Sequence, residues 1–318
     1  MAYSNTAAVL RADINGKVEE AAPNLSDFIG DKVMPEFSSP TKTGQYPVFK
    51  AGLSELLNDD VTTRARGGSY GKVIRAYTTD NFTCLDRGLE EAIDDTDEKD
   101  LSRFFNLEVS TAMRVMNQVR IGHERRVAAK IFDPAVFTAT AASVAYTEAN
   151  IATIAFPLDT LNLIDRVRGK GINGALYGVM SAPMWNRTRR STLLQNYIRG
   201  TKSTDSTLNL STKVVAEAFG LEDILVGRVP YNTAAKGKNF VSAFCWSNTY
   251  FWIGAVAGGE LLDSGAGRSI VWNQEGGLFV TETYRNEDIR SNMVRVRQNT
   301  IEKVVNGQAG ELITTSYS

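Results

Sequence analysis

One periodic stretch, from about residue 97 to residue 132, constrains the fold of this chain more than any other feature. Apolar residues recur there in steps of three and four, which is the spacing of one face of an α-helix. They are Leu101, Phe105, Val109, Ala112, Met116, Val119, His123, Val127 and Ile131. An uninterrupted helix over this stretch would be about 54 Å long, at about 1.5 Å per residue. Such a helix must span a wide, flat molecule or pack against a neighbour.

The two ends of this predicted helix carry opposite charges. The acidic residues that precede or open it are Asp94, Asp95, Asp97 and Glu98, and the basic residues near its end are Arg125, Arg126 and Lys130. This order matches the positive and negative ends of a helix dipole. The acidic group lacks the glycine and the distal glutamate of a calcium loop. We therefore predict a helix start and no metal site there.

Composition limits the function classes. The chain has 318 residues, 43% of them hydrophobic, which is enough for one large domain or two ordinary ones. Its 35 Lys and Arg against 36 Asp and Glu give a formal charge of -1, so no global field draws it to nucleic acid or to an anionic membrane. Two cysteines, no secretory signal and no apolar run near the roughly 18 residues of a membrane span predict a soluble, cytoplasmic protein without a membrane partner.

Only one histidine, His123, is present. General-base catalysis, histidine-assisted nucleophiles and most catalytic zinc sites use imidazole. Since His123 falls on the apolar stripe of the long helix, we interpret it as a packed or interface residue. The chain is predicted to be no enzyme and to hold no cofactor and no metal.

The first 85 residues look like segments that need a partner surface. Residues 1–43 contain short apolar patches separated by Pro23, Pro35 and Pro40, and read as an extended arm. Residues 45–85 read as a long two-stranded excursion with little apolar surface of its own. Because an isolated hairpin of this kind is marginal in water, we expect it to rest on another surface.

The remainder of the chain has a mixed α and β pattern. We predict helices over 158–167, 182–198 and 211–219, the last capped by Ser211 and ended by Gly220. Predicted strands cover 175–180, 224–226 and parts of 241–256 and 269–284. Residues 293–297 alternate between apolar and basic, which indicates a strand with one basic face.

Two groups of side chains could form binding surfaces. Arg125, Arg126, Arg295 and Arg297 could face DNA or a subunit interface, although no nucleic-acid-binding motif surrounds them. Trp246, Tyr250 and Trp252 would share one side of a strand. That side is either a sugar-stacking platform or, more often in proteins, core or interface.

Several sequence pieces are informative when they are taken together, in their order and spacing. They are residues 44–49, 64–68, 89–95, 226–234, 267–272, 284–286 and 294–297. In this order they resemble the major capsid protein of tailed bacteriophages, and the resemblance covers nearly the whole chain. The fold of that family is shared with the herpesvirus capsid floor and with encapsulin shells.

The resemblance implies an α+β fold with four parts. These are an N-terminal arm at 1–43, an extended β-hairpin loop at 44–85, a peripheral domain at 86–150 and 286–318 with a spine helix at about 97–132, and an α/β axial domain at 151–285. It implies a structural protein that assembles into hexamers and pentamers of an icosahedral shell around phage DNA. In that family the extended loop lies across the neighbouring subunit.

The charge pattern adds a hypothesis on that contact. Arg64, Arg66, Lys72 and Arg75 on the loop form one cluster, and Asp94, Asp95, Asp97 and Glu98 form the opposite one. We expect them to pair between neighbouring subunits.

The resemblance also suggests partners. The sequence lacks a long, charged, helical N-terminal region, so we expect a separate scaffolding protein. We also expect a portal, a decoration protein in some particles, and packaged double-stranded DNA held by non-specific contact. The protein would lie in the virion capsid after assembly in the bacterial cytoplasm. An encapsulin-like cargo shell and a sugar-binding module remain the alternatives.

Overall fold

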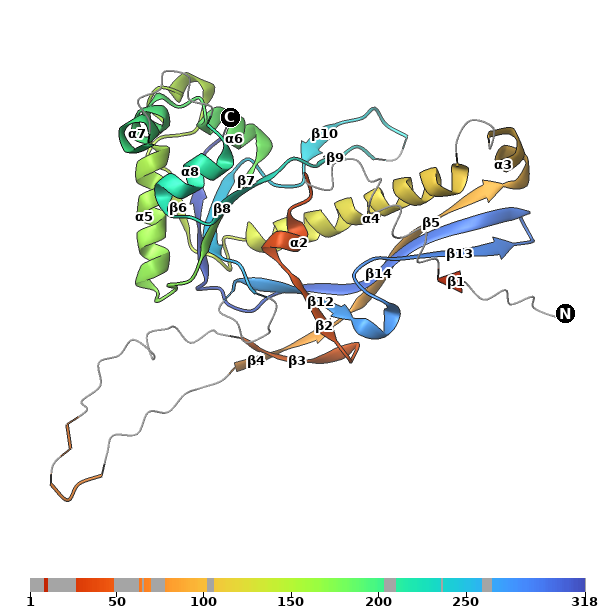
Figure 1. Ribbon diagram of the computed structural model, residues 1–318, viewed down its shortest axis with the longest axis horizontal. Helices are drawn as coiled ribbons and strands as arrows, with labels where there is room; N and C mark the ends of the chain where they lie inside the picture. Colours follow the sequence, from red (N-terminus) through yellow and green to blue (C-terminus); the bar gives the residue numbers. More distant parts are fainter. Residues whose placement is uncertain are drawn as a thin grey trace.

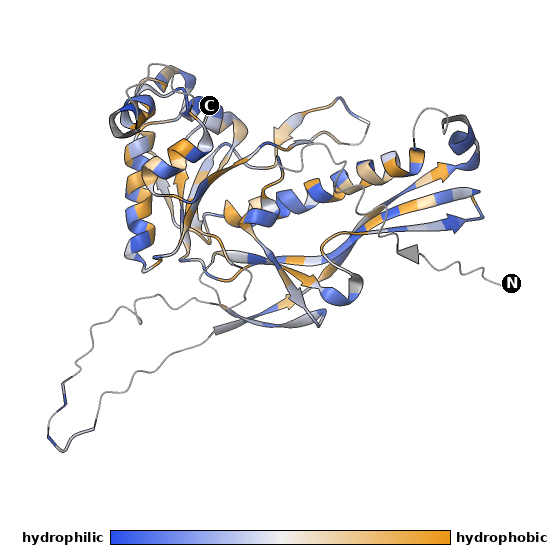
Figure 2. Ribbon diagram, in the orientation of Figure 1, coloured by the Kyte–Doolittle hydropathy of each residue, from blue (hydrophilic) through white to orange (hydrophobic). Residues whose placement is uncertain are grey.

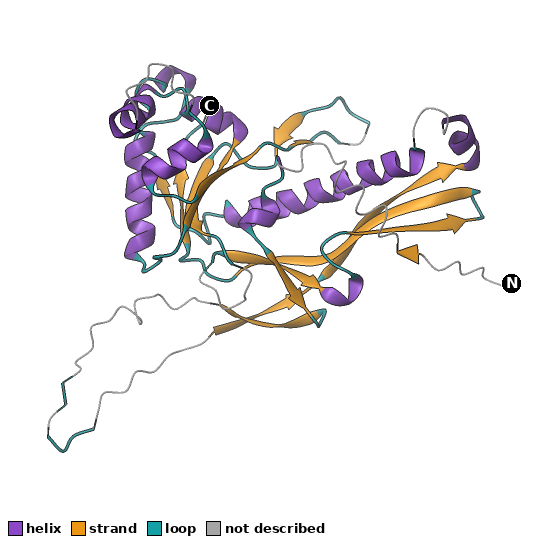
Figure 3. Cartoon of the chain, viewed as in Figure 1, coloured by secondary structure: helices purple, strands orange, loops and turns teal. Residues whose placement is uncertain are grey.

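The computed structural model describes residues 9–10, 27–48, 63–64, 66–69, 78–101, 106–202, 210–235, 237–258 and 265–317. Helices gather around one sheet at one end of the molecule, and long strands extend toward the other end (Figure 3). Most strand pairs are antiparallel, and helices and strands are largely segregated. The predicted α+β class is therefore confirmed.

The first sheet is built around one long strand. Its path runs β1 (Val9–Leu10), β13 (Val280–Asn286), β14 (Ser291–Val304), β12 (Gly267–Trp272) and β2 (Glu36–Ser39), and β5 (Leu85–Asp94) pairs with the other edge of β14. All pairs along it are antiparallel except β2 with β12. This sheet carries the helix α4 on one face (Figure 1).

Alternation along β14 decides which face is buried. Val294 and Val296 are fully buried and pack with Ile93 of β5 and with the apolar side of α4. Arg295 and Arg297 point to the opposite face, where they pair with glutamates. The predicted strand with one basic face is confirmed, because a period of two separates the two kinds of side chain.

The spine is two helices and not the single helix predicted over 97–132. α3 spans Asp95–Leu101 and α4 spans Leu107–Ile131. Asn106 between them has an extended backbone, with φ -77° and ψ 103°, and its Oδ1 accepts a hydrogen bond of 3.1 Å from the N–H of Val109. An asparagine that caps a new helix in this way interrupts the series of backbone hydrogen bonds that one continuous helix would need. The apolar spacing runs on across the break, which is why periodicity alone missed it. Hydrophobic and hydrophilic residues are interspersed along α4 (Figure 2).

The second sheet carries most of the shorter helices. Its order is β6 (Ala139–Ala141), β15 (Gly310–Thr314), β11 (Tyr250–Ala255), β7 (Leu176–Ser181) and β8 (Asp223–Gly227). The helices are α5 (Phe156–Gly169), α6 (Ala182–Thr188), α7 (Thr192–Lys202) and α8 (Thr212–Phe219), with a short 3-10 turn at Glu148–Asn150. A second 3-10 turn, Asn273–Glu275, joins β12 to β13 of the first sheet. The largest apolar cluster joins these elements to the end of α4. The predicted cap at Ser211 and the left-handed Gly220, with φ 69°, are both present in α8.

Each sheet draws strands both from the ranges assigned from the sequence to the peripheral domain and from the range assigned to the axial domain. β15 lies within 286–318 and pairs with β11 of the second sheet. β12 lies within 151–285, β13 begins there, and both flank β14 in the first sheet. The chain crosses between the two sheets more than once.

The N-terminal segment lies against its own chain. The short helix α2 (Gly30–Val33) packs on α4, and β2 adds a parallel edge strand beside β12. β3 (Thr43–Val48) and β4 (Thr78–Thr83) form the base of the predicted excursion, with Thr43 opposite Thr83. Beyond this base, only Thr63, Arg64 and residues 66–69 are described, so the remainder of the loop, including Lys72 and Arg75, lies outside the described residues.

One further hairpin projects over α4. It consists of β9 (Pro230–Asn232) and β10 (Ser242–Phe244), and its tip points away from α5 and α7 (Figure 1). Among the described residues, no helix is both long and apolar enough to cross a membrane.

Candidate intersubunit surfaces

The turn from β5 into α3 gathers four carboxylates, which we call the acidic tip: Asp94, Asp95, Asp97 and Glu98. Asp94 Oδ1 accepts a hydrogen bond of 2.8 Å from the N–H of Thr96, as a helix cap does. Asp95 is held by both terminal nitrogens of Arg285, one of them at 2.8 Å. Glu98 Oε2 accepts a bond of 3.0 Å from Asn292. The hairpin between β13 and β14 therefore already neutralises part of the acidic tip within the chain.

The pKa values of these carboxyl groups follow their contacts. Hydrogen bonds from Thr96 lower the pKa of Asp94, and hydrogen bonding from Arg285 lowers the pKa of Asp95. Both groups are therefore anions at neutral pH. The tip offers negative charge at the surface, where Asp94, Asp97 and Glu98 are exposed.

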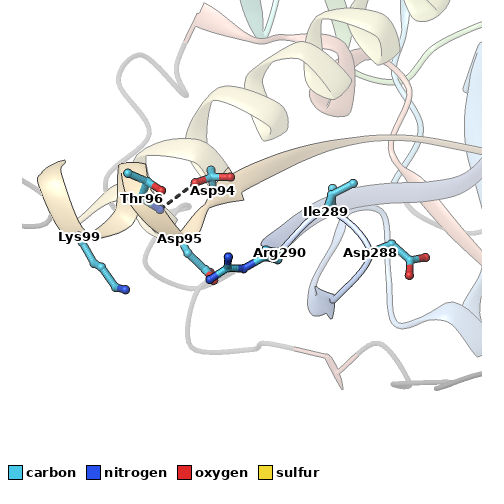
Figure 4. A pocket seen from close by; sticks show the side chains of 7 residues that line it. All are labelled: Asp94, Asp95, Thr96, Lys99, Asp288, Ile289 and Arg290. Carbon is cyan, nitrogen blue, oxygen red and sulfur yellow. Dashed lines mark hydrogen bonds between the residues drawn. The ribbon is translucent and has the colours of Figure 1, made fainter.

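A cavity of about 410 Å³ opens beside the acidic tip (Figure 4). Asp94, Asp95 and Thr96 line one side, and Asp288, Ile289 and Arg290 of the β13–β14 turn line the other. Arg290 has φ 49°, in the left-handed region that few residues with side chains adopt, and its carbonyl accepts from the N–H of Asp95. Acidic and basic groups thus share one open cavity, which fits a charged segment of a partner better than an apolar molecule.

The loop arginines do not meet the acidic tip within one chain. Arg64 and Arg66 are exposed. The described part of the loop, residues 63–64 and 66–69, and α3 lie at opposite ends of the molecule (Figure 1). A contact between the two clusters would have to be made between subunits. The part of the predicted cluster formed by Lys72 and Arg75 lies outside the described residues.

Arg295 and Arg297, predicted to face DNA or an interface, belong to an ion-pair ladder on the open face of the first sheet. Arg295 contacts Glu90 at 3.0 Å, and Arg297 contacts Glu282 at 2.7 Å. The hydroxyl of Tyr284 also donates to Glu90, at 3.1 Å. These are cross-strand neighbours, because Arg295 lies directly opposite both Glu90 and Glu282 in the ladder. Their positive charge is largely balanced inside the chain.

Arg125 and Arg126 on α4 have different surroundings. The guanidinium of Arg126 contacts the buried carboxylate of Glu302 at 3.0 Å. Arg125 is exposed and stacks on the ring of Tyr231, with 4.2 Å from Cζ to the ring centroid. Of the four predicted basic residues, Arg125 is thus the one that remains open to solvent and holds the β9–β10 hairpin against α4.

The most elaborate polar site was not predicted from the sequence. Glu124 is 3% exposed and accepts three hydrogen bonds, from the N–H groups of Ile29 (3.0 Å) and Gly30 (2.8 Å) and from the indole of Trp246 (2.6 Å). We call this set the Glu124 anchor. It ties the N-terminal segment, α4 and the strand region before β11 together. Burial raises the pKa of Glu124 against the opposing effect of these bonds.

His123 packs beside the anchor, as its place on the apolar stripe predicted. It is 2% exposed, and its Nε2 lies 3.6 Å from Asp31 and 3.4 Å from the hydroxyl of Ser269. Burial lowers its pKa, although the Asp31 carboxylate acts in the opposite direction. The sequence offered one signal for the anchor. A glutamate stands beside this histidine, and far along the chain a tryptophan needs an acceptor for its N–H once it is buried.

The sugar-stacking platform is wrong. Trp246 and Trp252 are fully buried, and Trp246 uses its N–H to bind Glu124. Neither indole face is open to a ligand, so the core interpretation holds.

The residues with nucleophilic or metal-binding chemistry are scattered. Within the described ranges, no three His, Cys, Asp or Glu side chains lie together as metal ligands. Burial raises the pKa of the Cys245 thiol to about 12 and also raises that of Cys84, so both are protonated at neutral pH.

Comparison with known proteins relates this geometry to a fold. No protein-family model and no curated protein matches the sequence. Solved structures do match. A phage-related protein from Bordetella bronchiseptica RB50 is 16% identical, with TM-score 0.69 and 98% of each chain covered. A virus-like particle from Pyrococcus furiosus is 12% identical, with TM-score 0.56 and 95% of this chain and 96% of that chain covered. The capsid of the cyanophage P-SCSP1u is 11% identical, with TM-score 0.56 and coverage of 90% and 86%. The chain therefore has a phage capsid protein fold, which the archaeal virus-like particle shares.

Proposed function

We propose that the chain is the structural subunit of a phage capsid, which assembles through hexamers and pentamers into a closed icosahedral shell. The observation that carries this proposal is the match, at TM-score 0.56, of 90% of this chain to 86% of the capsid protein of a cyanophage. The match over 98% of both chains to a phage-related protein supports it. The elongated shape of the molecule suits a subunit that contacts several neighbours (Figure 1).

Electron microscopy of the purified protein tests the proposal. We expect rings or closed shells in negative stain at micromolar concentration. A protein that stays monomeric at every concentration and salt tested, with and without co-expressed scaffolding protein, would refute it.

Within that shell we propose that the loop arginines bind the acidic tip of the adjacent subunit. Arg64 and Arg66 are exposed, and Asp94, Asp97 and Glu98 have carboxylate oxygens at the surface. Because Asp95 is already bound by Arg285, it adds to the negative electrostatic potential of the tip more than to direct contacts with the loop arginines. Lys72 and Arg75 extend the basic cluster in the sequence. Each exposed pair contributes only about 0–1 kcal/mol, but a shell repeats the contact many times.

Charge reversal separates this contact from a general charge effect. Arg64→Glu with Arg66→Glu should reduce assembly, and adding Asp94→Lys with Asp97→Lys should restore part of it. Lys130→Glu with Lys213→Glu changes the net charge equally at two exposed residues away from both clusters, and it should assemble normally. Equal assembly by the arginine variant and the wild type would exclude the pairing.

The shell would enclose double-stranded DNA held by non-specific contact, in a virion formed in the bacterial cytoplasm. A scaffolding protein, a portal and a decoration protein are the expected partners. Since Arg126, Arg295 and Arg297 are paired with glutamates, Arg125 is the main one of the four left to contact phosphate. An encapsulin-like cargo shell is the alternative, and a cargo enzyme gene beside this one, instead of portal and terminase genes, would favour it.

A further inference from the structure

The tip of the β9–β10 hairpin exposes a large aromatic side chain. Phe240 is 69% exposed and Val241 is 54% exposed, at consecutive positions in the loop that joins β9 to β10. This hairpin projects from the molecule (Figure 1). A single exposed apolar residue needs no explanation, but two adjacent ones on a projection indicate a binding surface.

Hydrogen bonds close the base of the loop between β9 and β10. Asn232 Oδ1 accepts hydrogen bonds from the N–H groups of Ala234 (3.0 Å) and Val241 (3.1 Å). The N–H and the hydroxyl of Thr233 both donate to the carbonyl of Val241, at 2.9 Å and 3.1 Å. Arg125 stacks on Tyr231 of β9. Phe240 is thus joined directly to a hydrogen-bonded loop base, and preordering there reduces the entropy lost on binding.

Three exposed leucines lie on α5 and α7, the helices from which the β9–β10 hairpin points away (Figure 1). Leu158 is 55% exposed and Leu161 is 37% exposed on α5, and Leu193 is 43% exposed on α7. The hydroxyl of Ser191 donates to the carbonyl of Ile154 at 3.0 Å, which holds the starts of the two helices together. We call these three leucines the α5–α7 patch.

A charged side chain lies near each of the two surfaces. Lys238 is exposed two residues before Phe240, and Asp165 is exposed one helical turn after Leu161. One turn rises about 5.4 Å, and two residues of extended chain span at most about 7 Å, so the two spacings agree. In the part of the chain that the structure describes, neither Lys238 nor Asp165 has an ion-pair partner.

We propose that Phe240 and Val241 of one copy bind the α5–α7 patch of a second copy, with Lys238 against Asp165. This contact rests on the proposed function, since it assumes that copies associate. The hairpin tip points away from α5 and α7, so no copy can satisfy its own patch (Figure 1). A head-to-tail contact between two different surfaces closes into a ring when its rotation permits. The binding partner is a second copy because one chain supplies both halves of the contact. Phe240 has the cation Lys238 near it, and the α5–α7 patch has the anion Asp165 near it.

Assembly of variants tests the contact. Phe240→Asp should raise the protein concentration needed for rings or shells by at least about tenfold, since it places a charge in an apolar contact. Val136→Asp alters another partly exposed apolar residue, outside both surfaces, and should assemble as the wild type does. Lys238→Asp and Asp165→Lys should each weaken assembly, and their combination should restore it. Equal unfolding midpoints for the soluble subunits show that the variants fold.

Disulfide capture gives an independent readout. Phe240→Cys with Leu161→Cys, in a Cys245→Ser background, should form reducible covalent multimers on oxidation, and either single cysteine variant should not. If the wild type builds shells while Phe240→Asp assembles normally and no multimer forms, this contact is wrong and the capsid proposal stands. If the wild type forms neither rings nor shells, both are wrong.

Discussion

The Glu124 anchor and the ion-pair ladder on the first sheet use the same kind of side chain in opposite environments. Glu124 is 3% exposed and accepts three hydrogen bonds, none of them from a cationic side chain. Glu90 in the ladder has a side chain that is 45% exposed and faces Arg295, which is 35% exposed. Water can replace a lost partner in the ladder, but it cannot reach the anchor.

This contrast shows where the stability of the fold depends on a single residue. The anchor joins three segments distant in sequence, at residues 29–30, 124 and 246, so its loss releases all three. The ladder joins strands that are already paired through their backbones. We therefore expect large, pH-dependent effects at buried carboxylates and small, salt-dependent effects in the ladder.

Removing the anchor carboxylate should give the largest effect. Glu124→Ala leaves two backbone N–H groups and one indole N–H buried without acceptors, and each such group costs about 1–3 kcal/mol. We expect a loss of about 3–5 kcal/mol in the free energy of unfolding, measured by urea denaturation of the soluble subunit. Glu124→Gln keeps one acceptor oxygen and should lose less. A loss below about 1 kcal/mol for the alanine variant would mean that water enters the site.

Crowding the anchor should give the next largest effect. A Cβ added at Gly30 would lie 2.6 Å from Oε2 of Glu124, closer than real contacts allow. Gly30→Ala should therefore push α2 off α4 and cost about 1–3 kcal/mol. Hydrogen exchange should become faster at residues 29–34 and stay unchanged in β14. Gly174→Ala is a matched control, since no atom lies within 4 Å of its added Cβ.

Local patterns predicted the elements that are determined locally. The alternation of residues 293–297 specified β14 and its two faces, and the Ser211 and Gly220 signals placed both ends of α8. The order of several short pieces was enough to indicate the fold. In each case the residues that decide the structure lie within one element.

The features that sequence reasoning missed depend on partners far along the chain. Asn106 is one polar residue in a continuing apolar pattern, and only its capping bond shows that a new helix begins there. Glu124 looks like an ordinary helix glutamate until Ile29 and Trp246 are brought beside it. The place of β15 also depends on distant partners, because it joins a sheet whose other strands come much earlier in the chain.

Lowering the pH should change the stabilising contributions of two buried carboxylates, Glu302 and Glu124, in opposite directions. Burial acts to raise the pKa of Glu302, but the hydrogen bond and charge of Arg126 outweigh it, and the net shift is downward. Its stabilising contribution is therefore present above the ordinary glutamate pKa of about 4.3 and is lost as pH falls through the lower folded value. Glu302→Gln should cost about 1–3 kcal/mol in the free energy of unfolding at pH 7, and this cost should shrink as pH falls below the ordinary glutamate pKa of about 4.3.

Glu124 should respond with the opposite sign. Its folded pKa is raised, so the folded state holds the proton more tightly than the unfolded state does. The stability gap between the wild type and Glu124→Gln should widen as pH falls from 7 toward the ordinary glutamate pKa. The measurement is urea denaturation of both glutamine variants and the wild type at several pH values. If the stability gap to the wild type changes with pH in the same direction for Glu302→Gln and Glu124→Gln, the assigned environments are wrong.

The ladder should show the smallest effect. Because Glu90 and Arg295 are both partly exposed and belong to strands joined by their backbones, Glu90→Gln or Arg295→Gln should change the free energy of unfolding by about 0–1 kcal/mol. A double-mutant cycle over the two residues should give a coupling energy of that size, and the coupling should shrink as ionic strength rises from about 0.05 M to about 1 M, because salt screens exposed charges. A coupling above about 2 kcal/mol, or one that salt leaves unchanged, would mean that this face of the sheet behaves as a buried surface even in the isolated subunit.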